Sequence, residues 1–467
     1  MNENLVSLSY LVAGVCFIFS LKWLSHPSTA RRGVMVGEIG MVLAVATTLL
    51  KAEIIQFQWI LTAGILGIAL GVPLGLFVPM TAVPQRTALS HAFGALAAGL
   101  VGTAEYYLDQ PHISHFQMSA LGVEVMLGFL TVTGSLIAAG KLQGIVRDKP
   151  FIYPGQNVVN IGALGVGVAL IVALVLDPGR TILFPILIVV ATLVGVMLVI
   201  RIGGADMPTV ISLLNSYAGL SAAAMGFVLN NELLIIAGAL DGSSGLILSL
   251  IMSRAMNRSF RNVVFGGFGG TTVAGPEGAI ETRPVRSVDV EETAMLLDAA
   301  AKVIIVPGYG MAAAQAQHKI RELSDALARR GVDVLFAIHP VAGRMPGHMN
   351  VLLAEADVPY DRLRDLDQIN EEFAQADVAL VVGANDVVNP AARNDPNSPI
   401  SGMPILAVDQ ARSVIVVKRS MRSGFAGIEN ELFYLDKTQM LFGDAKQVIG
   451  GVVDELQRLP ARAAVEA

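Results

Sequence analysis

One short stretch of the sequence has the residue types and spacing of a phosphate-binding turn. Gly308, Gly310 and Ala313 follow the apolar run Lys302–Pro307 and form the pattern G-x-G-x-x-A. Two glycines let the backbone approach a pyrophosphate at a helix N-terminus, and alanine in the third position still permits close packing of the helix on the strand. The motif alone is weak, but a buried strand before it and a helix after it predict a dinucleotide site.

A second group of residues indicates which dinucleotide would bind. An NAD-type domain places an acid at the end of its second strand, whereas this chain has Ile338-His-Pro340 there, followed by Arg344. Further along, Lys418-Arg-Ser420 offers two cations and a hydroxyl that suit a phosphate monoester. The missing acid and the added cations favour NADP over NAD, although a solvated basic edge would also account for the triplet.

Polar residues inside apolar runs form a third group. His91 lies near the start of one such run, and an imidazole can take and release a proton near neutral pH. Asn215 lies in another run and can both donate and accept hydrogen bonds; Glu124 and Asp241 also fall within apolar runs. Ionisable groups at membrane depth are costly and invite a functional explanation. His91 is either a proton carrier or a structural hydrogen-bonding residue, and Asn215 either holds water or ties helices together.

The composition separates the chain into two parts. Of its 467 residues 54% are hydrophobic and 15% are charged; 13 of the 32 Lys and Arg residues fall within 1–261 and 19 within 262–467. The first part therefore predicts a membrane domain and the last 200 or so residues a soluble one. The single cysteine, Cys16, excludes an internal disulfide, no His, Cys, Asp or Glu cluster has metal-ligand spacing, and the net charge of −6 gives no sign of nucleic-acid binding.

Nine apolar runs have the length needed to cross about 30 Å of hydrocarbon. The predicted spans are Leu5–Leu24, Val34–Leu50, Trp59–Val78, Thr87–Tyr107, Met118–Ala139, Val158–Leu176, Ile182–Ile200, Thr209–Leu229 and Leu233–Met252. With the N-terminus outside, eleven Lys and Arg residues fall on the cytoplasmic side of these spans and two, Lys51 and Arg180, on the other. This bias, with an odd number of spans, places the C-terminal domain in the cytoplasm.

The soluble part alternates apolar strands with helical stretches. Strands are predicted at Lys302–Pro307, Val332–His339, Asp377–Val382, Pro404–Val408 and Ser413–Lys418, and helices at Val290–Ala300, Ala312–Arg330 and Ala445–Arg458. Such alternation predicts an α/β, doubly wound (Rossmann-like) parallel sheet. We therefore divide the chain into a polytopic α-helical membrane domain (1–261), a flexible glycine-rich linker (262–288) and a nucleotide-binding domain (289–467).

Several longer motifs together resemble the beta subunit of the proton-translocating NAD(P) transhydrogenase, over essentially the whole chain. The motifs that carry this resemblance are Arg201-Ile-Gly-Gly-Ala-Asp-Met-Pro208, Leu214-Asn-Ser-Tyr217, Val306-Pro-Gly-Tyr-Gly-Met311, Ile338-His-Pro-Val-Ala-Gly-Arg344, Pro346-Gly-His-Met-Asn-Val-Leu-Leu353, Gly383-Ala-Asn-Asp386, Asn389-Pro-Ala-Ala392 and Lys418-Arg-Ser-Met421. Their number and order leave little room for chance.

The resemblance implies roles for particular residues. The residues around NADP(H) would be Gly308, Tyr309, Gly310, Met311, Val341, Ala342, Gly343, Arg344, Gly383, Ala384, Asn385 and Asp386. Lys418, Arg419 and Ser420 would bind the 2′-phosphate, and the loop 422–427, with Gly424 and Phe425, would cover the cofactor. His91 and Asn215 match proton-path positions and Asp386 a coupling position. Phe425 departs from the tyrosine that is more usual there, and Asp241 has no place in the family pattern.

The resemblance also implies the reaction and the partners. Hydride would pass directly from one nicotinamide to the other, between NAD(H) on an alpha subunit and NADP(H) on this chain, with proton translocation favouring NADPH. The protein would position the reactants without an acid or base, a metal or a flavin. We expect a bacterial inner-membrane protein that works with the alpha subunit, with or without a further small membrane subunit, as a dimer of alpha–beta units. The open alternatives are a channel or transporter gated by NADP or NAD, and a membrane-anchored dehydrogenase.

Overall fold

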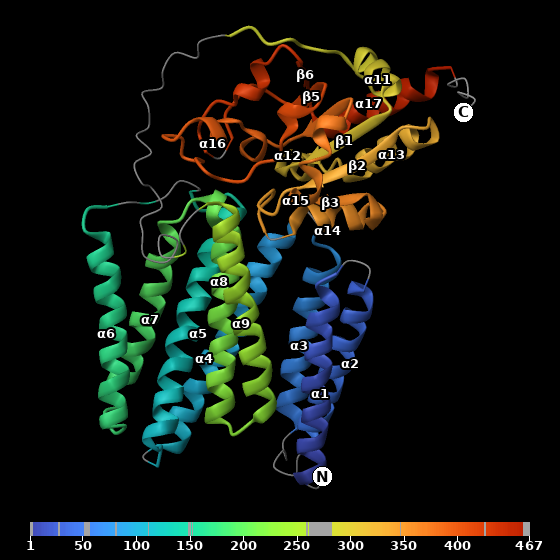
Figure 1. Ribbon diagram of the computed structural model, residues 1–467. Helices are drawn as coiled ribbons and strands as arrows, with labels where there is room; N and C mark the ends of the chain where they lie inside the picture. The colour runs from blue at the N-terminus through green and yellow to red at the C-terminus, as the bar shows by residue number, and fades with distance from the viewer. Residues whose placement is uncertain are drawn as a thin grey trace. The chain divides into compact units, whose positions relative to one another are not determined.

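The computed structural model describes residues 3–26, 29–50, 57–79, 82–110, 112–147, 151, 153–257, 260, 283–345, 347–424 and 426–460. The chain separates into two compact units, one made mainly of the residues up to Leu250 and the other mainly of those beyond it. Figure 1 shows a helical unit and a sheet-containing unit. Most of the predicted linker, residues 262–282, lies outside the described residues, so its flexibility stays a prediction.

Within the described part of the chain, nine helices are long and apolar enough to cross a membrane, which confirms the predicted spans to within a few residues. They are α1 (Glu3–Leu24), α2 (Ala30–Leu49), α3 (Phe57–Leu76), α4 (Val83–Asp109), α5 (His115–Leu142), α6 (Gln156–Leu176), α7 (Leu183–Ile200), α8 (Met207–Val228) and α9 (Glu232–Ala255). The predicted α-helical membrane domain is thus confirmed as a fold.

Helix α5 is the centre of the helical unit and packs against α4, α6, α7 and α8. Its start is fixed by a capping box in which Ser114 and Gln117 satisfy each other's backbone N–H groups. Near its end the buried Lys141 ammonium donates to the carbonyls of Ile200 (2.7 Å) and Ile202 (2.6 Å), which α7 leaves open at its C-terminus. Lys141 therefore holds the end of α5 against the end of α7.

Glycines make the contact between α8 and α9 unusually close. A Cβ on Gly219 would come within 2.7 Å of the backbone of Gly242, and one on Gly245 within 2.7 Å of the Ser216 nitrogen. Small residues permit this approach of two helix backbones in lipid. By contrast the spaced glycines of α3, including Gly67 and Gly71, face no atom within 4 Å among the described residues.

The second unit is built on a six-stranded parallel sheet with the order β3-β2-β1-β4-β5-β6. The strands are β1 (Lys302–Pro307), β2 (Asp333–Ile338), β3 (Leu363–Asp365), β4 (Val378–Val382), β5 (Ser413–Lys418) and β6 (Thr438–Phe442). This is the strand order of a doubly wound dinucleotide-binding domain, which confirms the predicted α/β fold.

Helices lie on both faces of this sheet. The helices are α11 (Val290–Ala299), α12 (Tyr309–Ala313), α13 (Gln317–Arg329), α14 (His348–Glu355), α15 (Leu366–Ile369), α16 (Ala391–Asn394) and α17 (Ala445–Arg458). Helix α17 packs against α11 and α13, and the opposite core gathers Phe373, Leu406 and Phe433 on the strands. Ahead of α11, the carbonyl of Arg286 accepts from the Met440 nitrogen (2.8 Å), so the last predicted linker residues run beside β6.

Two predicted elements were wrong and two strands were not predicted. Pro404–Val408 is not a strand, because Pro404 has no N–H and the carbonyls of Pro404 and Ile405 are taken by His339 and Asn370 side chains. Strands β3 and β6 were missed, the first being three residues long at the sheet edge. The predicted helix Ala312–Arg330 is interrupted between α12 and α13, where Gln315 has a φ of +50°.

Candidate functional site

The two central strands end in glycine loops that interlock. Gly308 donates its N–H to the Val382 carbonyl and Gly310 donates to the Gly383 carbonyl, both at 2.9 Å. A Cβ on Gly310 would lie 2.6 Å from the Gly383 Cα, and Gly383 itself has a φ of +68°. These glycines are therefore required for the contact between the loops after β1 and β4, a reason the sequence pattern did not supply.

This interlock lies at the topological switch point of the sheet. After β1 the chain continues to β2 on one side of the sheet, and after β4 it continues to β5 on the other side. In doubly wound domains, ligands bind in the crevice at such a point. Tyr309, Asn385 and Asp386 are half-buried here, whereas Met311 is buried beneath. The predicted residues of the first and third loops are thus brought together.

The loop after β2 reaches the same place through a cation–π contact. The Arg344 guanidinium lies over the Tyr309 ring, 4.4 Å from its centroid. Gly343, with a φ of +112°, packs on the ring of the fully buried His348, whose Nδ1 accepts the Arg344 backbone N–H at 3.1 Å. His348 therefore holds the loop Val341–Arg344 in position.

Two buried histidines in this region stay neutral. Burial lowers the pKa of His348 to about 4, with a further contribution from the Arg344 charge. Burial likewise lowers the pKa of His339 to about 4, against the opposing effect of its bond to the Pro404 carbonyl. His339 accepts the Val341 N–H on Nδ1 (3.2 Å) and reaches the Pro404 carbonyl with Nε2 (2.7 Å), which fixes a single tautomer. Neither histidine was predicted as a site residue.

The predicted covering loop is fastened to the loop after β4. The Ala426 N–H donates to the Asp386 carboxylate at 2.9 Å, and Gly424 lies so close to Asp386 that a Cβ would come within 2.5 Å of Oδ1. Beyond the loop, the Asn430 amide donates to the Asn385 carbonyl at 3.0 Å. Segment 422–430 is thus held against the switch point; Phe425 lies outside the described residues.

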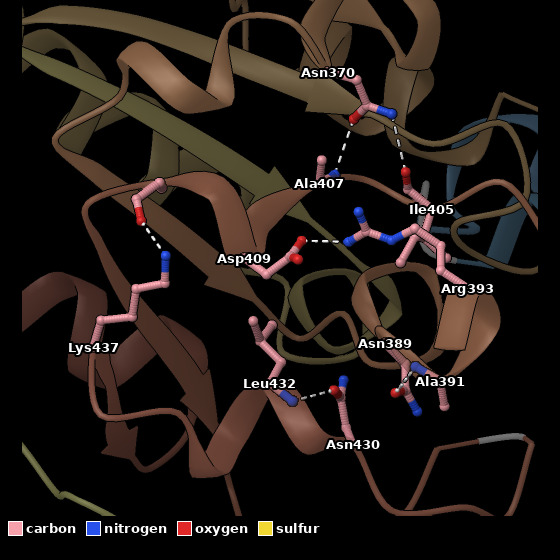
Figure 2. Close-up of polar contacts among 11 residues, drawn as sticks. Asn370, Asn389, Ala391, Arg393, Ile405, Ala407, Asp409, Asn430, Leu432 and Lys437 are labelled. Atoms are coloured by element: carbon pink, nitrogen blue, oxygen red, sulfur yellow. Dashed lines mark hydrogen bonds and ion pairs between the residues drawn. The ribbon is translucent and has the colours of Figure 1, made fainter. Parts of the chain in front are cut away.

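Asn389 and Asn430 hold this segment in place, and sequence reasoning assigned neither of them a role. Asn389 is fully buried and donates to the Glu429 carbonyl at 2.9 Å, while its Oδ1 accepts the Ala391 N–H. Asn430 also accepts the Leu432 N–H at 3.0 Å (Figure 2). The motif Asn389-Pro-Ala-Ala392 was noted, but only the fold shows that it anchors the covering segment.

The three residues Lys418, Arg419 and Ser420 at the end of β5 differ in their surroundings. The Lys418 ammonium donates to the Arg422 carbonyl at 2.6 Å and lies 4.6 Å from the centroid of the Phe433 ring. Burial lowers the pKa of Lys418, and the nearby negative charge of Asp386 partly opposes this. Arg419 and Ser420 are exposed. One cation is therefore positioned by the protein, whereas the other and the hydroxyl remain accessible to a phosphate.

A separate pocket of about 780 Å³ opens in the same unit. Its wall includes Asn370, which joins the Ile405 carbonyl to the Ala407 N–H, and Arg393, which pairs with Asp409 (Figure 2). None of the predicted nucleotide contacts lines this pocket. This pocket is therefore distinct from the switch point.

In the helical unit, His91 and Asn215 each lie eight residues from the start of a helix, α4 and α8 respectively, and these two helices pack together. Both helices run in the same direction in an alternating bundle, so a rise of about 1.5 Å per residue puts the two side chains at a similar depth, about 12 Å in. His91 Nδ1 is buried, with no hydrogen-bond partner among the described residues.

Two carboxyl groups within the spans differ in their surroundings. The Asn215 amide donates to the Asp241 carboxylate at 3.1 Å, across the seam between α8 and α9. Glu124 of α5 is fully buried against Gly102, and neither of its oxygens has a hydrogen-bond partner in the part of the chain that the structure describes. Asp241, which sequence reasoning left without a role, is therefore the direct partner of a predicted proton-path residue.

Over the described ranges, no group of three or more His, Cys, Asp and Glu side chains is arranged to hold a metal ion. The residues at the switch point instead fit a dinucleotide. The Asn385 amide nitrogen is a buried donor that has no partner within the described chain, and Arg419 and Ser420 are exposed just after β5, the strand that pairs with β4. Donors and cations of this kind bind ribose and phosphate oxygens.

Membrane-length helices and a doubly wound sheet in one chain define a membrane protein with a Rossmann-like domain. Residues 6–455 match the family model of the NAD(P) transhydrogenase beta subunit. Two curated relatives named NAD(P) transhydrogenase subunit beta, from Rhodospirillum rubrum and a named strain of it, are each 50% identical over 466 residues, covering 98% of this chain and 100% of theirs. The chain belongs to the NAD(P) transhydrogenase beta subunit family.

Family membership confirms the resemblance found in the sequence. It makes the chain a subunit of an oxidoreductase that acts on NAD(P), and implies both NADP(H) and NAD(H) as nucleotides and an alpha subunit as partner. The roles of individual residues stay predictions, and they are taken up as proposals below.

Proposed function

We propose that this chain binds NADP(H) at the switch point between β1 and β4, while the alpha subunit presents NAD(H). Bound NADP(H) supplies the redox chemistry, because its nicotinamide exchanges hydride directly with that of NAD(H). The chain's own residues position and enclose the nucleotide. Tyr309, Arg344 and Asp386 would border it, and the segment 422–430 would close over it. The interlocked loops and their fastened cover are the single observation that carries this proposal.

The choice of NADP(H) rests on Lys418, Arg419 and Ser420. Lys418 is held in place at the end of β5, and the end of β2 carries His339 in place of an acid. Charge-assisted bonds to a 2′-phosphate contribute about 1.5–3 kcal/mol each. Two such bonds are enough to select NADP(H) over NAD(H) by at least about 100-fold.

Proton translocation would bias the reaction toward NADPH. One charge that moves through about 150 mV releases about 3.5 kcal/mol, which shifts the NADPH/NADP ratio by a few hundredfold. His91 and Asn215, at a similar depth on adjacent helices, are the proposed proton path, and Asp386 is the proposed coupling residue. The excess of Lys and Arg on one side of the spans supports an orientation in a bacterial inner membrane with the N-terminus outside and the nucleotide domain in the cytoplasm. We further propose a dimer of alpha–beta units, with or without a small membrane subunit.

Nucleotide titration of the full chain in detergent tests the cofactor assignment. We expect tight binding of NADP(H) and at least about 100-fold weaker binding of NAD(H). In the double variant Lys418→Ala/Arg419→Ala, the two affinities should become similar. The control is Lys437→Ala, because Lys437 bonds to the Ala411 carbonyl at the amino ends of β5 and β6, whereas Lys418 lies at the carboxyl end of β5. A preference for NAD(H), or an equal loss in the control, would contradict the assignment; tight binding without hydride transfer to the alpha subunit's nucleotide would favour a nucleotide-gated channel.

A further inference from the structure

The seam between α8 and α9 holds a carboxyl group at membrane depth. Asp241 lies nine residues from the start of α9, about 13 Å into a helix about 36 Å long. Its side chain is exposed at the surface of the helical unit, and its Oδ1 accepts the Asn215 amide at 3.1 Å. A carboxyl group in this position is costly to ionise in hydrocarbon, so its presence calls for a reason.

The contact with Asn215 is built into the helix packing. On either side of it, the Ser216 hydroxyl donates to the Gly242 carbonyl at 2.7 Å, and a Cβ on Gly245 would come within 2.9 Å of the Asn215 amide nitrogen. The two backbones are thus locked at van der Waals distance, and the amide is aimed at the carboxyl. A chance surface contact between two flexible side chains would lack this support.

Few other titratable groups surround Asp241. Helix α8 has only Tyr217, and α9 has Glu232 and Arg254 near its ends. Helix α1 contacts α9 through Gly14 and Ile236, but its Tyr10 bonds to Thr48 of α2 and its Cys16 lies against Gly40 of α2. The hydroxyl of Ser244 donates to the backbone carbonyl of Asp241 at 2.9 Å.

We propose that Asp241 is a proton-binding site of this chain, paired with Asn215 and open at the surface of the helical unit. Protonation adds one proton to Oδ2 and converts the carboxylate to a neutral acid, while Asn215 continues to donate to Oδ1. Release reverses the step, and no other reactant is needed. The inference rests on the proposed proton path for its functional consequence, though the binding of a proton at Asp241 stands apart from it.

Infrared difference spectroscopy of the full enzyme in liposomes tests the binding step directly. Titration with pH should give a carboxylic-acid band that is absent in Asp241→Asn and shifted in Asn215→Ala. Ser244→Ala is the matched control: it removes a hydroxyl one turn away and should leave the band unchanged. A band that persists in Asp241→Asn would overturn the proposal.

Proton translocation by the same preparations tests the consequence. We expect Asp241→Asn to lower the coupled rate at least about 10-fold and Asp241→Glu to restore much of it, with Ser244→Ala close to the wild-type rate. If the wild-type enzyme translocates protons and Asp241→Asn does so at an undiminished rate, a role of Asp241 in translocation is overturned, while the proposed function stands. A wild-type enzyme that transfers hydride without moving protons would contradict the proposed function, and the infrared band would then still decide whether Asp241 binds a proton.

Discussion

The loops at the switch point and the polar residues of the membrane helices differ in how closely distant parts of the chain hold them. At the switch point, four segments far apart in the sequence are joined by short contacts: Gly310 to Gly383, Arg344 to Tyr309, Ala426 to Asp386 and Asn430 to Asn385. In the helical unit, His91 Nδ1 and both Glu124 oxygens lie buried without a partner among the described residues.

The difference separates binding from transport. A nucleotide site gains affinity when its loops are already in the bound arrangement, because less ordering is left to the ligand. A group that carries protons must change its charge state, and a fully bonded environment would fix it in one state. We therefore expect nucleotide binding at the switch point to be most sensitive to substitutions that change side-chain size. Proton translocation by the membrane helices should be most sensitive to substitutions that change charge.

The largest effect is expected from Gly383→Ala. A Cβ there would come within 2.6 Å of the Gly310 carbonyl carbon and the Met311 nitrogen, so the two loops must separate. We expect NADP(H) affinity to fall at least about 100-fold in an equilibrium titration, equivalent to about 2.7 kcal/mol. Gly331→Ala is the control: Gly331 has a similar φ of +82° but nothing within 4 Å of its Cβ. Equal losses would mean that backbone strain, not the interlock, matters.

A smaller effect is expected from Asp386→Ala, which removes the acceptor of the Ala426 N–H. Hydrogen bonds to a charged group contribute about 1.5–3 kcal/mol, so NADP(H) should dissociate roughly 10- to 100-fold faster in stopped-flow measurements. Asp409→Ala removes an acid that pairs with Arg393 away from the predicted contacts and should leave the rate unchanged. An unchanged rate in Asp386→Ala would show that the segment 422–430 does not retain the nucleotide.

The two neutral histidines should make the nucleotide domain sensitive to acid. The pKa of His339 and of His348 is about 4 in the fold against 6.5 in the unfolded chain, so the unfolded state binds more protons between these values. Stability is therefore complete above pH 6.5 and falls as the pH drops toward 4, by roughly 3 kcal/mol for each histidine. Calorimetry of the full chain should show this decrease of the unfolding free energy with falling pH, and the decrease should be smaller in His348→Asn. The same decrease in His348→Asn and in the wild-type chain would contradict a neutral, buried His348.

The smallest effect is expected at the amino ends of the central strands, away from the switch point. Asp377 accepts the N–H groups of Ala301 (2.8 Å) and Lys302 (3.1 Å), which with the charge of Arg412 lower its pKa. Asp377→Ala should destabilise the domain by about 1–2 kcal/mol in denaturant unfolding without changing NADP(H) affinity. Arg412→Ala removes only an exposed partner and should cost less than about 1 kcal/mol. A loss of NADP(H) affinity in Asp377→Ala would show that the amino and carboxyl ends of the central strands are coupled.

The sequence predicted those features that depend on local patterns. Apolar length located the nine spans, and strand alternation located β1, β2, β4 and β5. Contacts between segments far apart in the chain could not be predicted from the sequence. The glycine pattern at Gly308 indicated a nucleotide, but its fit against Gly383 depends on the strand order. The same holds for Asn389, Asn430 and Asp241, whose partners become neighbours only after folding.

Coupling between the two regions is the central claim, and the pH dependence of NADPH affinity in the full enzyme tests it most directly. If protonation at His91 changes how tightly the nucleotide domain holds its cofactor, the dissociation constant should vary at least about 10-fold between pH 5.5 and 8.5, or about 1.4 kcal/mol. In His91→Ala the dissociation constant should no longer vary with pH. In His348→Asn its variation near neutral pH should be the same as in the wild-type enzyme. The same pH dependence in His91→Ala and in the wild-type enzyme would contradict the account.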